Sequence, residues 1–212
     1  MSNRIISAGD IMYYVKGTQS MSSVDVKGIE YWKKCWGVDH ILKNADTVFV
    51  CIPTETQADI DTVITEIKLI QEFNPLATFV IRSTLPLGSC ERIQQELGNI
   101  IYIPEFLRER YWDTDCFKRP LVVGYDNIDL PQWLLDEEIN TCTTKEAELV
   151  KMYSNNFAVI KIAFANVFYD LAENVGADYD KVKDAFLKVQ HSQTYLDVPG
   201  HDGTRGFGGK CF

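Results

Sequence analysis

The 212-residue sequence lacks features that define several classes of protein. Its six cysteines form no CxxC pair, which argues against a zinc site, and we expect no bound metal. Lysine and arginine number 21 against 30 aspartates and glutamates, a formal net charge of -9, so no basic face is expected for nucleic acid. No apolar run of about eighteen residues is present that could span a membrane.

A secretion signal is also missing, because the N-terminal stretch MSNRIISAGDIMYYVKG has no apolar core followed by a small-residue cleavage site. We therefore expect a cytoplasmic protein with reduced thiols. Five of the cysteines are interpreted as small core or surface residues, and Cys211 as the exception. The hydrophobic content of 46% and charged content of 24% are typical of a folded chain.

The glycine loop that usually opens a dinucleotide-binding fold, GxGxxG, is not found near the N-terminus. Residues 4–9 read as a strand, but Gly9 at its end stands alone. A second strand is predicted at 22–28, where Asp25 (or Asp10 before it) could bind a ribose hydroxyl. The other interpretation of Asp25 is an ordinary turn residue.

From residue 45 to 139, short apolar runs rich in β-branched residues alternate with helical patterns. The predicted strands are 45–53, 77–84, 99–106 and 120–126, and the predicted helices are 59–73, 90–97 and 130–139. This alternation predicts an α/β fold with a Rossmann-like parallel sheet and right-handed crossovers. Ligands of such sheets bind at the carboxyl ends of the strands.

A long helix is predicted over 144–176, because this stretch has no proline, begins with Thr144 and nearby acids, and stops at Gly176. At 1.5 Å per residue it would be about 45 Å long. It is apolar on more than one face, as in helices that cross between domains or subunits. A second helix, 178–189, is expected to pack back on it. We predict a nucleotide-binding domain over 1–143 and a helical dimerisation domain over 144–212.

Five segments in order resemble the UDP-glucose/GDP-mannose dehydrogenase family over about residues 40–212. They are ADTVFVCIPT (45–54), IRSTLPLGS (81–89), PEFLRER (104–110), the helical run 147–178 and VPGHDGTRGFGGKCF (198–212). The resemblance implies NAD-dependent oxidation of a nucleotide sugar such as UDP-glucose, by a homodimer that uses the 144–176 helix. In this family the C6 alcohol becomes a carboxylate in two hydride transfers, through a cysteine thioester.

The resemblance also implies catalytic residues. Cys211 aligns with the family's nucleophile, and Lys151 and Asn155 with its lysine and asparagine. These two lie four residues apart, so both face one side of a helix and could stabilise an oxyanion. Glu105 could act as a base or position a water, and Thr84 could hold that water. Without the resemblance, Lys151 reads as a solvated helix lysine and Glu105 as a helix cap.

The expected ligand contacts follow from the same segments. Residues expected to bind NAD are Asp25, Pro53, Thr54, Ser83 and Thr84. Residues expected to bind the nucleotide sugar are Glu105, Phe106, Leu107, Glu109, Lys151, Asn155, Gly206, Phe207 and Gly208. Family members continue past the cysteine into a third domain that binds UDP, so the resemblance implies a chain truncated before that domain. The alternative expectation is a catalytically inactive homologue that acts as a dimerisation or binding module.

Overall fold

The computed structural model describes residues 5–8, 21–23, 46–52, 54, 56–98, 100–106 and 121–189. The chain divides into two compact units, 1–157 and 158–212, and the division falls inside the long helix. The domain boundary predicted at 143/144 stays a prediction.

The first unit is built on a sheet of seven strands in the order β2-β1-β3-β4-β5-β6-β7. The strands are β1 (Ile5–Ala8), β2 (Met21–Ser23), β3 (Thr47–Val50), β4 (Thr78–Ile81), β5 (Ile101–Tyr102), β6 (Leu121–Tyr125) and β7 (Ile139–Cys142). Strands β1 to β5 are parallel, which confirms the predicted α/β sheet. Strand β6 is antiparallel to β5 and parallel to β7. The strand order reverses between β1 and β3, the place where such folds bind their ligands.

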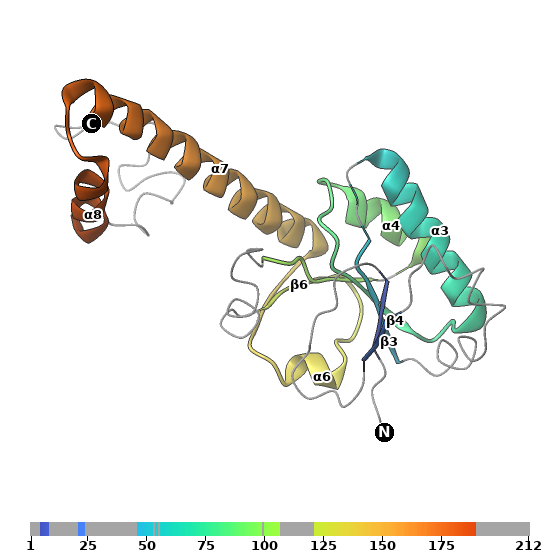
Figure 1. Ribbon diagram of the computed structural model, residues 1–212. Coiled ribbons are helices and arrows are strands. Elements are labelled where there is room, and N and C mark those ends of the chain that lie inside the picture. The colour runs from blue at the N-terminus through green and yellow to red at the C-terminus, as the bar shows by residue number, and fades with distance from the viewer. Residues whose placement is uncertain are drawn as a thin grey trace, which may run out of the picture. The chain divides into compact units, whose positions relative to one another are not determined.

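The helices in the described part of the chain are α3 (Gln57–Phe73), α4 (Ser89–Leu97), α6 (Gln132–Leu135), α7 (Thr144–Val175) and α8 (Tyr179–Val189). Helices α3 and α4 cover one face of the sheet and α6 lies on the other (Figure 1). The helix predicted at 130–139 is wrong in its length, because only α6 is helical and the chain then enters β7. The long helix is confirmed, and Gly176 follows it with a φ of 68°.

The core follows the two-residue period of the strands. On β3, Val48 and Val50 face α3 and α4, while Phe49 faces α6 and lies with its ring centroid 5.6 Å from that of Trp133. Helix α3 buries Ile60, Val63 and Ile67 against the first of these faces. Two apolar layers, one on each face, therefore hold the strand ends in fixed positions.

In the second unit, α8 contacts the end of α7. The rings of Tyr169 and Tyr179 meet edge to face, with their centroids 5.3 Å apart. The Ala177 amide donates to the Ala172 carbonyl at 2.9 Å, a bond of the kind that closes a helix ending at a left-handed glycine. Within the described ranges, no helix is long and apolar enough to cross a bilayer.

Candidate active site

Two segments that leave neighbouring strands are joined by hydroxyl groups. Ser83, after β4, donates from Oγ to the main-chain carbonyl of Ile52, after β3, at 2.6 Å. In the opposite direction, Thr54 donates from Oγ1 to the carbonyl of Thr84. The structure therefore brings together three of the predicted cofactor contacts, Thr54, Ser83 and Thr84, next to the point where the strand order reverses.

Lys151 reaches the exit of the next strand, β5. Its Nζ donates to the main-chain carbonyl of Glu105 and lies 5.2 Å from the centroid of the Phe106 ring. The side chain is half-buried, so Lys151 is not a solvated helix lysine. Burial lowers its pKa, the charge of Arg82 lowers it further, and the Glu105 carboxylate opposes both. A partly desolvated ammonium at this edge can stabilise a developing oxyanion.

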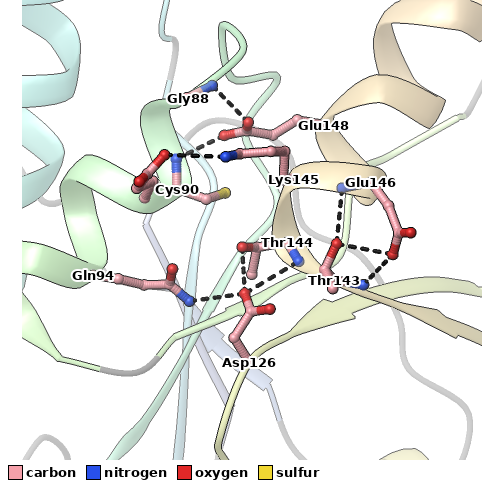
Figure 2. Close-up of polar contacts among 10 residues, drawn as sticks. Gly88, Cys90, Gln94, Asp126, Thr143, Thr144, Lys145, Glu146 and Glu148 are labelled. Atoms are coloured by element: carbon pink, nitrogen blue, oxygen red, sulfur yellow. Dashed lines mark hydrogen bonds and ion pairs between the residues drawn. The ribbon is translucent and has the colours of Figure 1, made fainter.

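The start of α7 lies toward the amino-terminal ends of the parallel strands, away from the strand exits that Lys151 reaches. The reason is that Thr144 bonds to Asp126, which follows β6, and β6 is antiparallel to β5. Asp126 accepts hydrogen bonds from the Thr144 amide and from Gln94 of α4, each at 3.2 Å, and from the Thr144 hydroxyl. Burial opposes ionisation of Asp126, but these bonds outweigh it and hold its pKa below the ordinary value. Figure 2 shows Asp126 between the two helices.

One helical turn after Thr144, Glu148 bonds α7 to the beginning of α4 (Figure 2). Its side chain is only 1% exposed, and its two oxygens accept the amides of Gly88 at 2.7 Å and Cys90 at 2.6 Å. Lys145 and Glu91 form an ion pair between the same helices at 3.3 Å. Helix α7 thus runs antiparallel to α4 and brings Lys151 to the carboxyl edge of the sheet.

Cys90 is a structural thiol. It is fully buried, and burial together with the Glu148 carboxylate raises its pKa far above the ordinary value. A thiol in such surroundings is a poor nucleophile. This agrees with the interpretation of Cys90 as a core residue.

Asn155 lies on α7, four residues after Lys151, and its side chain is exposed. The remaining predicted site residues lie outside the part of the chain that the structure describes: Asp25, Pro53, Leu107, Glu109, Gly206, Phe207, Gly208 and Cys211. Sequence reasoning missed Arg82 and Glu148. The available signal for Glu148 was its position three residues before Lys151, which places both side chains on one helix face.

Comparison with known proteins agrees with this architecture. Residues 145–212 match the central domain of the UDP-glucose/GDP-mannose dehydrogenase family. The chain is 32% identical over 193 residues to UDP-glucose 6-dehydrogenase of Rickettsia conorii, covering 81% of this chain and 43% of that protein. It is 31% identical over 201 residues to the enzyme of Rhizobium meliloti, covering 79% of this chain and 44% of that protein. The chain thus spans less than half the length of these curated relatives.

Among solved structures, the chain is similar to the NDP-N-acetyl-D-galactosaminuronic acid dehydrogenase of Methanosarcina mazei Go1. The TM-score is 0.56 at 15% identity, with 89% of this chain and 54% of that chain covered. This similarity concerns the fold. The family match and the sequence relatives lead to one conclusion: the chain belongs to the UDP-glucose/GDP-mannose dehydrogenase family.

Proposed function

We propose that the chain contributes the cofactor edge and reacting groups of an NAD-dependent, cytoplasmic dehydrogenase that oxidises C6 of a nucleotide sugar such as UDP-glucose. The supporting observation is the half-buried ammonium of Lys151, which donates to Glu105 and lies over Phe106 at the carboxyl edge of the sheet. Parallel sheets bind nucleotides at this edge, and a charge held there in advance is suited to transition-state stabilisation.

The residues at the exits of β3 and β4 fit the edge of a dinucleotide site. Thr54 and Ser83 use their hydroxyl hydrogens on main-chain carbonyls, and each oxygen keeps lone pairs that can accept from a ligand. Pro53, Thr84 and Asp25 complete the proposed set of contacts. These residues would hold NAD, which would supply the hydride acceptor for each of the two oxidations.

At the reacting carbon, the Cys211 thiolate adds to the C6 aldehyde and forms a carbon–sulfur bond. Lys151 and Asn155 stabilise the resulting oxyanion. Oxidation of this thiohemiacetal gives a thioester, which is then attacked by a water that Thr84 holds and from which Glu105 accepts a proton. The carbon–sulfur bond breaks, the carboxylate leaves, and the thiolate is restored. Phe106, Leu107 and the glycine-rich segment around Phe207 would bind the nucleotide sugar.

We also propose that two copies associate through the 144–176 helix. Its second half exposes large apolar side chains, which a second copy would cover. They are Val159, Ile160, Ile162, Phe164, Val167, Leu171 and Val175.

The test of activity supplies, in trans, the part of the Rickettsia conorii relative that lies beyond the matched region, because this chain spans 43% of that protein. With NAD and UDP-glucose present, NADH should form with two equivalents per equivalent of carboxylate. Cys211→Ala should abolish it. If the reconstituted protein forms a stable dimer but no NADH with any nucleotide sugar, the dehydrogenase proposal is wrong, and the inactive dimerisation module is the better account.

A further inference from the structure

We propose that Glu148 is a positioning residue for Lys151: it fixes the loop that carries Ser83 and Thr84 at a set place relative to the lysine. That Lys151 is a reacting group rests on the proposed function. The attachment itself rests on contacts within the first unit of the chain.

Three side chains on one face of α7 make three attachments. Thr144, Glu148 and Lys151 follow the i, i+4, i+7 spacing of a helix face. They bond respectively to the residue after β6, to the start of α4 and to the exit of β5. Glu148 is the middle attachment. Without it, the helix that carries Lys151 would lose its hydrogen bonds to the end of the loop after β4 and to the start of α4.

The loop after β4 is held at both of its ends. Ser83 is bonded to Ile52 at the beginning, and the Gly88 amide is bonded to Glu148 at the end. Between them the Leu85 amide donates to the Tyr102 hydroxyl at 3.4 Å. Because only a few residues separate these anchors, a shift at Gly88 is passed to Thr84. Glu148 ties this loop to the helix of Lys151.

The Glu148 carboxylate also occupies the N-terminus of α4, which would otherwise attract an anion. It accepts two amides of that first turn, where the helix dipole favours negative charge. A phosphate group is therefore not expected at α4. A purely stabilising cap would use the same contacts, so the test must separate local positioning from global stability.

The experiment measures how fast each lysine of the full chain is acetylated by acetic anhydride, with peptide mass spectrometry at low extents of reaction. Lys181, whose side chain is 85% exposed, is the internal reference. In Glu148→Gln, the side chain has one acceptor oxygen where the carboxylate has two, so it can accept from only one of the two main-chain amides. Lys151 should then react about fivefold faster relative to Lys181, the factor that corresponds to about 1 kcal/mol of local stability. Glu148→Asp, which keeps the charge on a shorter side chain, should change the rate in the same direction.

Two controls isolate the effect. Glu146→Gln removes the same charge two residues away, from an exposed carboxylate that accepts hydrogen bonds from the amide and the hydroxyl of Thr143, and it should leave the Lys151 rate unchanged. Leu134→Ala weakens the core on the α6 face and should also leave it unchanged while the chain is folded. An unchanged Lys151 rate in both Glu148 variants overturns the proposal, and so does an equal rise in Leu134→Ala. No step requires turnover, so the result is independent of the NADH assay.

Discussion

Substitution of Gly124 tests how closely α7 is seated on the sheet. A Cβ at this position would lie 2.6 Å from the Ala147 Cβ, 2.9 Å from the Thr144 Cα and 3.1 Å from the Thr143 carbonyl. Two of these neighbours are main-chain atoms at the start of α7, so the helix itself must move. Overpacking of this kind costs about 1–3 kcal/mol, and we expect Gly124→Ala to be near 2 kcal/mol less stable. For a chain of this size that corresponds to a melting temperature lower by about 4–8 °C.

Urea denaturation of four proteins measures the effect: the parent, Gly124→Ala, Ala147→Gly and the double variant. Ala147→Gly alone should cost about 1 kcal/mol, because glycine weakens a helix interior. It also removes the nearest clashing atom, so the double variant should be more stable than the sum of the single effects predicts, by about 0.5–1 kcal/mol. Strict additivity, or a neutral Gly124→Ala, would refute the close contact between β6 and α7.

Three further predictions concern charge and association. Asp126 has a folded-state pKa below its unfolded value, so its contribution is present above the unfolded pKa of about 4 and is lost as the pH falls through the folded value. Asp126→Asn should therefore cost about 1 kcal/mol at neutral pH, with the difference from the parent shrinking below pH ~4 in urea titrations. If the proposed activity holds, Lys151→Met should lower the kcat of NADH formation by the reconstituted protein about 10²–10³-fold. The lost hydrogen bond should cost about 1 kcal/mol of stability at most, because burial already disfavours the ammonium. If two copies associate as proposed, Ile160→Glu, at a side chain 63% exposed, should shift the chain from dimer to monomer in sedimentation equilibrium.

The central elements could be predicted because their local patterns and their tertiary roles agree. Helix α3 places Ile60, Val63 and Ile67 at helical spacing, and these residues are all buried. Strand β3 is a β-branched run buried on both faces, as the central strands of parallel sheets are. Gly176 ends α7 because its positive φ suits glycine.

Strand β7 was missed for a physical reason. Its sequence INTC carries polar residues at the two middle positions, both exposed at the edge of the sheet, so no apolar alternation marks it as a strand. The preceding apolar residues of α6 favoured a longer helix. Only pairing with β6 decides that residues 139–142 are extended.

The site residues named from the sequence are those that lie in the family's motifs. From the sequence, Glu148 is only one of the acids near Thr144 that suit the helix dipole of α7. Its actual partners are amides of α4, separated from it by 58 and 60 positions in the sequence. Such a contact depends on the antiparallel course of two helices, which no local pattern contains.

The most direct test of the proposed chemistry is a crystal structure of the reconstituted protein with UDP-glucose bound. We expect the Nζ of Lys151 and the Sγ of Cys211 both to face C6 of the sugar and to lie within about 6 Å of each other, close enough for the ammonium to favour the thiolate. A structure in which the sulfur and the ammonium lie on separate surfaces, with the sugar at neither, would contradict it.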